Sequence, residues 1–144
     1  MGLGVGDMAL ESSEYCSIYD IRFLVKRGII ITPPTLETLN AVIALKRVTA
    51  DDVAKLTGRA RTIESRYLAR LNKMGIVARI KEGRRIYYLE PIYAVQQYYS
   101  IYGDAITPEQ LAHMLSLPAD IVRIILESIK AKKSTSSTPS APKT

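Results

Sequence analysis

The sequence predicts a mainly α-helical fold that contains one small β-hairpin. Apolar residues recur at helical spacing over most of the 144 residues. After Gly75 the period of the pattern changes to two, over residues 76–81 and again over residues 86–89. Glu82 and Gly83 separate these two runs and are typical of a tight hairpin turn that needs a positive φ. Further helical segments follow the hairpin.

The charge of the chain is concentrated in one segment. Nine Lys or Arg residues and two Glu residues lie between Arg59 and Arg85, which gives this segment a net charge of +7, whereas the whole chain carries +6. The remainder is therefore close to neutral. A compact cationic patch of this kind is typical of a nucleic-acid site. With 47% hydrophobic residues, the chain can bury one core, or one core and a small satellite.

Four helices are expected before the hairpin, over residues 12–27, 35–45, 50–56 and 60–74. Ser12 and Ser13 are candidate caps for the first helix, and Gly28 is its candidate end. Thr49 is a good N-cap for the third helix, and Gly75 has the position of a C-cap for the fourth. The apolar face expected for the first helix consists of Ile18, Ile21, Leu24 and Val25.

Three helices are expected after the hairpin, over residues 91–102, 107–115 and 118–132, and a Ser/Thr/Pro/Lys-rich tail should be disordered. The expected organisation is a flexible start (1–11), a main domain (12–90), a C-terminal helical segment for docking or dimerisation (91–133) and the disordered tail (134–144).

The helix expected over residues 60–74 has two distinct faces. Placing residues at 100° intervals puts Ile63, Tyr67, Leu71 and Met74 on a core side, with Leu68 at its margin. The opposite side is centred on Ala69, with Thr62 and Ser65 beside it and Arg61, Arg66 and Lys73 at its rims. Small residues flanked by cations suit a helix in a DNA major groove. The alternative is a merely solvated helix face.

Residues 49–89 thus form a helix-turn-helix pattern followed by a hairpin. Residues 62–79, followed by the basic strand 84–89, resemble the recognition helix and wing of winged helix-turn-helix regulators, of the archaeal and bacterial kind that includes the ArsR and MarR groups. The similarity covers residues 35–89. It implies that Arg61, Thr62, Ser65 and Arg66 contact bases and nearby phosphates, and that Lys81, Arg84 and Arg85 contact the backbone or the minor groove. The full expected DNA-binding set is Arg59, Arg61, Thr62, Ser65, Arg66, Ala69, Arg70, Lys73, Lys81, Arg84 and Arg85.

Residues 107–132 align with residues 49–74 without a gap, at an offset of 58. The matching positions include the candidate cap Thr49/Thr107 and the apolar pairs Val53/Leu111 and Leu68/Leu126. This segment is either a degenerate second helix-turn-helix or an ordinary helical hairpin. Its outward face carries carboxylates, which would repel DNA, so we expect it to bind a second copy or a partner protein. The expected contact residues are Tyr98, Tyr99, Tyr102, Asp120, Ile124 and Glu127.

The sequence contains no arrangement that indicates catalysis. No Cys/His or Ser/His pairing with a third member and no Gly-rich phosphate loop is present. The single Cys16 and the single His113 leave no ligand set, so neither a metal nor a cofactor is expected. Metal-sensing cysteines of the ArsR kind are also absent from residues 50–56. Without an apolar run of about 20 residues or a signal segment, the chain is expected in the cytoplasm.

Three functions remain open. The first is a sequence-specific, double-stranded DNA-binding transcription regulator, associated with the nucleoid and acting as a homodimer on two half-sites. The second is a winged-helix protein-interaction module of a transcription, replication or division complex. The third is a DNA-coating protein without sequence preference. None of them is an enzyme.

Overall fold

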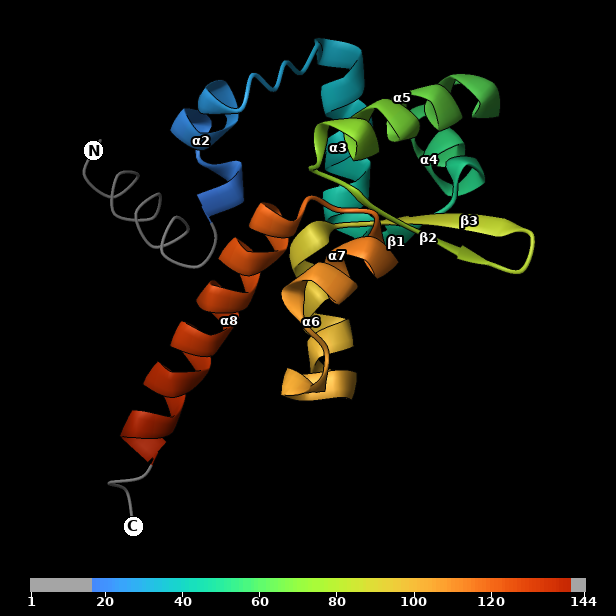
Figure 1. Ribbon diagram of the computed structural model, residues 1–144. Coiled ribbons are helices and arrows are strands. Elements are labelled where there is room, and N and C mark those ends of the chain that lie inside the picture. Colours follow the sequence, from blue (N-terminus) through green and yellow to red (C-terminus); the bar gives the residue numbers. More distant parts are fainter. Residues whose placement is uncertain (1–16, 141–144) are drawn as a thin grey trace.

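The structure is a computed structural model that describes residues 17–140, with side chains from residue 18 to residue 132. Its seven described α-helices and two 3-10 turns surround one small sheet (Figure 1). The helices are α2 (Ile21–Lys26), α3 (Pro33–Leu45), α4 (Ala50–Thr57), α5 (Arg61–Met74), α6 (Pro91–Tyr102), α7 (Pro108–Leu115) and α8 (Ala119–Ser140), and the 3-10 turns are η1 (Ser17–Tyr19) and η2 (Gly103–Ala105). Among these residues, none of the helices combines the length and the apolar character that a bilayer crossing requires.

The sheet is antiparallel and has the strand order β1-β3-β2, with β1 (Arg47–Val48), β2 (Ala78–Glu82) and β3 (Arg85–Leu89). The hairpin β2–β3 confirms the strands expected around Gly83, which has a φ of 63°. Strand β1 was not expected, because two residues are too short to show an alternating pattern. It pairs with β3 through Val48 opposite Tyr88 and so joins the end of α3 to the hairpin.

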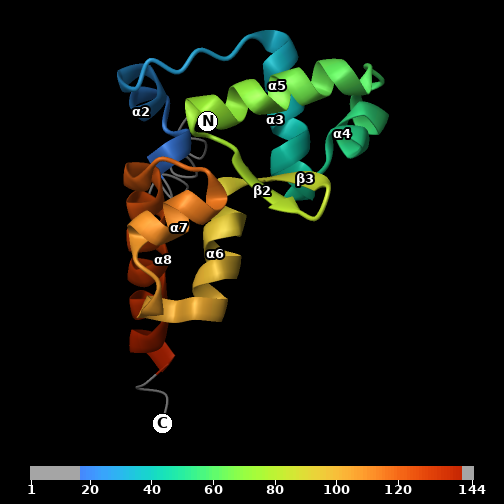
Figure 2. The ribbon, with the colours of Figure 1, turned by 45° about the vertical axis from the view of Figure 1, so that its right-hand side comes forward.

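The sheet lies between two groups of helices (Figures 1 and 2). One apolar cluster joins α3, α4 and α5 to Tyr88 and Val77, and a second joins α6, α7 and α8 to Ala78, Ile80 and Leu89. Successive residues of a strand point to opposite faces, so adjacent residues such as Tyr88 and Leu89 enter different clusters. The chain therefore has two apolar clusters, where the composition predicted one core with at most a small satellite.

Helices α3, α4 and α5 followed by the hairpin form a winged helix-turn-helix. Thr49 caps α4 in a capping box with Asp52, as the sequence predicted. Gly58 then adopts the left-handed conformation with a φ of 80° and turns the chain from α4 towards α5. Gly75 ends α5 in the same conformation, with a φ of 89°. The two helices and the wing thus have the order and the boundaries expected, within one or two residues.

Two expected boundaries were wrong. The single helix expected over residues 12–27 is interrupted at Asp20, whose extended backbone and side chain cap α2 through the amide of Arg22. Ile21 and Val25, expected on its apolar face, are 72% and 70% exposed; Ser12, Ser13 and the expected flexible start lie outside the described residues. At the other end, α8 continues to Ser140 and includes most of the tail expected to be disordered. The last part of that tail, residues 141–144, is outside the described residues.

A buried polar network fixes the first turn of α5. The side chain of Glu64 in α5 is fully buried. One of its oxygens accepts a hydrogen bond from the Thr38 hydroxyl of α3 at 2.6 Å, and the other accepts from the Thr57 hydroxyl at 2.5 Å and from Arg59 Nε at 2.7 Å. Arg59 also donates to the carbonyl of Pro34 at 3.1 Å. The network therefore connects α3, the end of α4 and the beginning of α5.

These contacts also determine the ionisation of Glu64. Burial by itself raises the pKa of this carboxyl, but the hydrogen bonds from Arg59, Thr38 and Thr57 outweigh burial, so the pKa lies below the ordinary value of 4.5. The carboxylate is thus charged and fully paired at neutral pH. No buried side-chain nitrogen or oxygen atom among the described residues lacks a hydrogen-bond partner.

The C-terminal end of α5 contacts the turn between α7 and α8. Asn72 Nδ2 donates to the carbonyl oxygen of Val77 at 2.8 Å and to that of Ser116 at 3.0 Å. A Cβ atom on Gly75 would lie 2.7 Å from Cγ of Pro118. Gly75 is therefore required both by its positive φ and by this close approach.

We expect Gly75→Ala to destabilise the protein more than Gly58→Ala. Both substitutions place a Cβ at a positive φ, which costs about 1–2 kcal/mol. Only Gly75→Ala also meets a close neighbour, because nothing lies within 4 Å of a Cβ at Gly58, and overpacking adds about 1–3 kcal/mol. Urea unfolding of the two variants measures the difference. Equal losses would show that Pro118 yields to the added methyl group.

We expect Glu64→Gln to lower the free energy of unfolding by about 3 kcal/mol or more at neutral pH, because Arg59 loses the anion of a buried pair. The folded pKa of Glu64 is depressed, so its contribution is present above pH 4.5 and is lost as the pH falls through the folded pKa. The stability difference between wild type and variant should therefore shrink below pH 4.5 in urea titrations. A difference that stays constant down to pH 3 would contradict this assignment.

Candidate nucleic-acid interface

Helix α5 presents a broad exposed face to solvent. Its exposed residues include all those the sequence predicted, Arg61, Thr62, Ser65, Arg66, Ala69, Arg70 and Lys73. The buried side, however, is formed by Glu64, Leu68 and Leu71, whereas Ile63, expected in the core, is 36% exposed. The exposed face is therefore centred near Arg66 and Lys73 and not on Ala69. The network around Glu64 causes this rotation, because it draws Glu64 to the middle of the buried side.

The wing supplies a second group of exposed cations. The side chains of Lys81, Arg84 and Arg85 are exposed, and none of them forms an ion pair or a hydrogen bond with another described residue. The acid of the wing, Glu82, forms an ion pair with Arg47 of β1 at 2.7 Å. The guanidinium of Arg47 also lies 4.1 Å from the centre of the Tyr87 ring. Pairing of Glu82 within the sheet leaves the wing with a net positive charge.

The structure brings the helix and the wing together around one polar hollow. This hollow has a volume of about 490 Å³ and is lined by Arg61 and Ser65 of α5 on one side and by Arg84 and Arg85 of the wing on the other. Arg61 also pairs with Asp51 at 3.2 Å, but both side chains are well exposed, so water weakens this contact. Residues predicted separately as helix contacts and wing contacts thus form one continuous surface.

The hollow is also lined by a cation that was not in the predicted DNA-binding set. Lys55 of α4 is exposed and belongs to the same lining as Arg61. A signal for it existed, since the first helix of a helix-turn-helix crosses the DNA backbone and a cation there can contact phosphate.

Arg59 was expected to bind DNA, and the structure places it elsewhere. Its guanidinium is turned into the protein, where it donates to Glu64 and also to Glu37 at 2.5 Å. Only 23% of its side chain is exposed. The reason is electrostatic, because the buried carboxylate of Glu64 requires a cation nearby and Arg59 is adjacent to it across the turn.

The residues expected to contact a protein partner are more buried than predicted. Ile124, Tyr98 and Tyr99 are partly buried and lie against the cluster of α6, α7 and α8. Asp120 at the start of α8 forms an ion pair with Arg27. Of the expected set, Tyr102 and Glu127 remain freely exposed.

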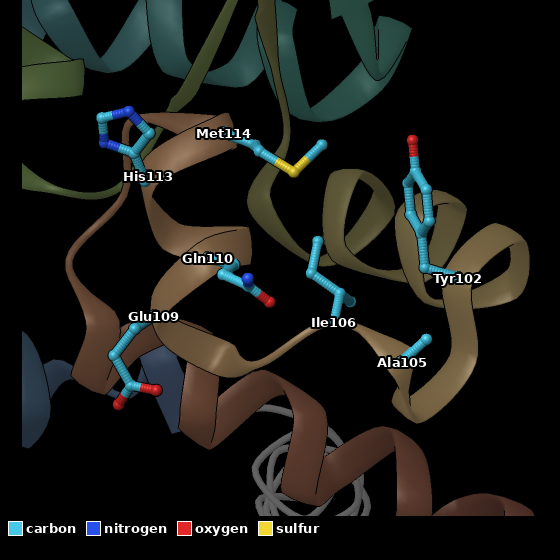
Figure 3. A pocket seen from close by; sticks show the side chains of 7 residues that line it. All are labelled: Tyr102, Ala105, Ile106, Glu109, Gln110, His113 and Met114. Carbon is cyan, nitrogen blue, oxygen red and sulfur yellow. The ribbon is translucent and has the colours of Figure 1, made fainter.

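Tyr102 borders a second, apolar hollow of about 580 Å³ between the end of α6 and α7. The side chain of Met114 points towards Ile106 and Tyr102, while the carboxylate of Glu109 points away from them (Figure 3). Tyr102 and Met114 are 45% and 38% exposed at this hollow, and Ile101, the neighbour of Tyr102 along α6, is 70% exposed. Across residues 17–140, no group of three His, Cys, Asp or Glu side chains is arranged to hold a metal ion.

The second helical pair repeats the framework of the first. Thr107 caps α7 in a capping box with Gln110, and Ser116 adopts the left-handed conformation that Gly58 has between α4 and α5. The aligned positions Val53 and Leu111 are fully buried in their own clusters. Helices α7 and α8 are therefore arranged at the turn as α4 and α5 are.

The fold has solved relatives at low similarity. The YusO protein from Bacillus subtilis is 15% identical with a TM-score of 0.41, over 93% of each chain. A single-residue mutant of MarR from E. coli, complexed with operator DNA, is 20% identical with a TM-score of 0.40, over 91% of this chain and 93% of that one. Because both TM-scores are below 0.5, the assignment of the fold rests on the elements described above.

No protein-family model matches the chain. A sequence relative is an uncharacterized protein of Archaeoglobus fulgidus, which is 42% identical over 53 residues. These residues are 37% of this chain and 72% of the relative. With this identity over more than two thirds of its length, the chain belongs to the same protein family as the Archaeoglobus fulgidus protein.

Proposed function

We propose that the chain is a sequence-specific regulator of transcription that binds double-stranded DNA in the cytoplasm, in association with the nucleoid. The observation that carries this proposal is the continuous surface formed by α5 and the wing, whose cations at Arg66, Lys81, Arg84 and Arg85 are exposed and unpaired within the described residues. Helix α5 enters the major groove, where Thr62, Ser65 and Arg66 contact base edges. Lys81, Arg84 and Arg85 contact the backbone or the minor groove.

A DNA-coating protein without sequence preference is the second candidate. It is favoured by the rotation of α5, which brings Arg66 and Lys73 towards the centre of the exposed face. Cations there would contact phosphates whatever the sequence. Selection of binding sites from a random duplex library distinguishes the two functions. A regulator enriches a defined site, whereas a coating protein enriches none.

We also propose that the protein acts as a homodimer and that residues 91–133 form the interface. The exposed apolar side chains of Ile101, Tyr102 and Met114 support this proposal. Ile124, which the sequence predicted at the interface, lies against the core and does not support it. To read two half-sites one turn of DNA apart, the two-fold axis has to place the two copies of α5 about 34 Å apart, and the site is then palindromic. A protein partner on the same surface is the alternative.

Binding to duplex DNA should depend strongly on salt. If a dimer neutralises about 6–8 phosphates, the affinity falls about a thousandfold or more between 50 and 200 mM salt. Fluorescence anisotropy with labelled duplexes measures this dependence. A flat response to salt, or no binding at 50 mM, would refute DNA binding through this surface.

Helix and wing variants should have different effects. Ser65→Ala and Arg61→Ala should each reduce the preference for the selected site by about 1–3 kcal/mol if the lost contact is to a base. The double variant Arg84→Ala/Arg85→Ala should weaken binding to all sequences alike and reduce the slope of the salt dependence by about 4 for a dimer, because two cations are lost from each protomer. Competition titrations measure both quantities. Loss of preference in the wing variant alone would reverse the two roles.

Ile101→Glu should convert the dimer into monomers that retain only weak binding to a half-site, because a carboxylate would be buried in the interface. Ile21→Glu is the matched control, since Ile21 is equally exposed but lies on α2. Light scattering measures the mass of both variants. A monomeric wild type, or monomers produced by Ile21→Glu and not by Ile101→Glu, would exclude the proposed interface.

A further inference from the structure

The two helical pairs provide an internal comparison of how a helix-turn-helix is held together. They share the cap, the left-handed residue at the turn and buried apolar positions in both helices, with the same spacing along the chain. Each pair also lies against its own apolar cluster on one side of the sheet. The shared positions are Thr49/Thr107, Gly58/Ser116, Val53/Leu111 and Leu68/Leu126.

The pairs differ at the three positions that form the polar network. Thr57, Arg59 and Glu64 of the first pair align with Leu115, Leu117 and Val122 of the second. Leu115 and Val122 are fully buried and Leu117 is 6% exposed, so these three apolar side chains fill the corresponding interior. The second pair therefore forms the same turn without a buried charge.

A buried ionic network is not required to stabilise this turn, because apolar side chains can do so at a lower cost in free energy. Removing Glu64 from water costs several kcal/mol, and apolar side chains of similar volume often stabilise a fold as well or better. Apolar contacts, however, have no preferred direction, whereas the hydrogen bonds to Glu64 come from Thr38, Thr57 and Arg59 at set angles and distances. Of the two helical pairs, the first, α4 and α5, has this network, and the exposed face of its second helix is cationic.

We propose that Arg59 and Glu64 are positioning residues for DNA recognition. Through Thr38 and Thr57, they hold the first turn of α5 in one orientation and thereby align Thr62, Ser65 and Arg66 with base edges, while Arg59 itself does not contact DNA. This inference rests on the proposed function and concerns how one site is preferred over others. The preference for one DNA site over others would then depend on buried residues as well as on the exposed face of α5.

The test replaces the three network residues of the first pair with the apolar residues found at the aligned positions of the second pair. The variant Thr57→Leu/Arg59→Leu/Glu64→Val removes one cation and one anion, so the net charge of the chain does not change. Its binding to random duplex DNA, and the salt slope of that binding, should therefore equal those of wild type. Its preference for the site that wild type selects from a random library should fall about tenfold or more, since base contacts tolerate little displacement.

The double wing variant Arg84→Ala/Arg85→Ala is the control. It should bind DNA more weakly and with a smaller salt dependence, but it should keep the preference for the selected site. A triple variant with unchanged preference would overturn the proposal. So would a reduced salt slope in Arg59→Leu, which would make Arg59 a phosphate contact. Should the triple variant fail to fold, Thr38→Val removes one donor to Glu64 with little change in shape and should also reduce preference at constant salt slope.

Amide hydrogen exchange without DNA separates this inference from the proposed function. In the triple variant, exchange at residues 57–64 should accelerate relative to wild type, while exchange at residues 115–122, where the interior is unchanged, should not. If wild type selects no site, sequence-specific regulation fails, and the exchange result alone decides whether the network orients α5. Unchanged exchange at residues 57–64 would overturn the positioning role.

Discussion

The hairpin β2–β3 is the constraint on which the rest of the structure depends, because both faces of its base pack against helices. Ile86 and Tyr88 lie against α3, α4 and α5, while Tyr87 and Leu89 lie against α6, α7 and α8. A slip of one residue in the register would exchange these two sets of side chains. The register with β2 and the short strand β1 therefore determines how α3, α4 and α5 are joined to the C-terminal helices.

The two helical pairs on either side of this hairpin use different means to hold the same turn. The first keeps a buried carboxylate at Glu64, and the second has Val122 at the aligned position. Apolar packing is sufficient for the fold of the second pair, so the polar network of the first adds directional contacts that packing does not require. It also accounts for the orientation of α5, in which Leu68 and Leu71 are buried and Arg66 faces solvent.

Ion pairing decides where the positive charge of the chain is available. On α8, Arg123 pairs with Glu109 and Lys130 with Asp104, so these two cations are paired within the chain. On the wing, Lys81, Arg84 and Arg85 have no such partner among the described residues. Although both helical pairs carry basic residues, α5 and the wing carry exposed cations without an ion-pair partner among the described residues, such as Arg66 and Arg84.

The sequence by itself determined the helices between residues 33 and 132, the hairpin and the exposed cations of α5, because caps, glycines and apolar periodicity act over a few residues. It did not reveal β1, which exists only through pairing with β3. Nor did it show that Arg59 turns inwards, since that depends on Thr38, which is distant along the chain but contacts both Arg59 and Glu64. Only the tertiary structure decided the centre of the exposed face, because one buried carboxylate with partners on three segments rotates the helix relative to its apolar pattern.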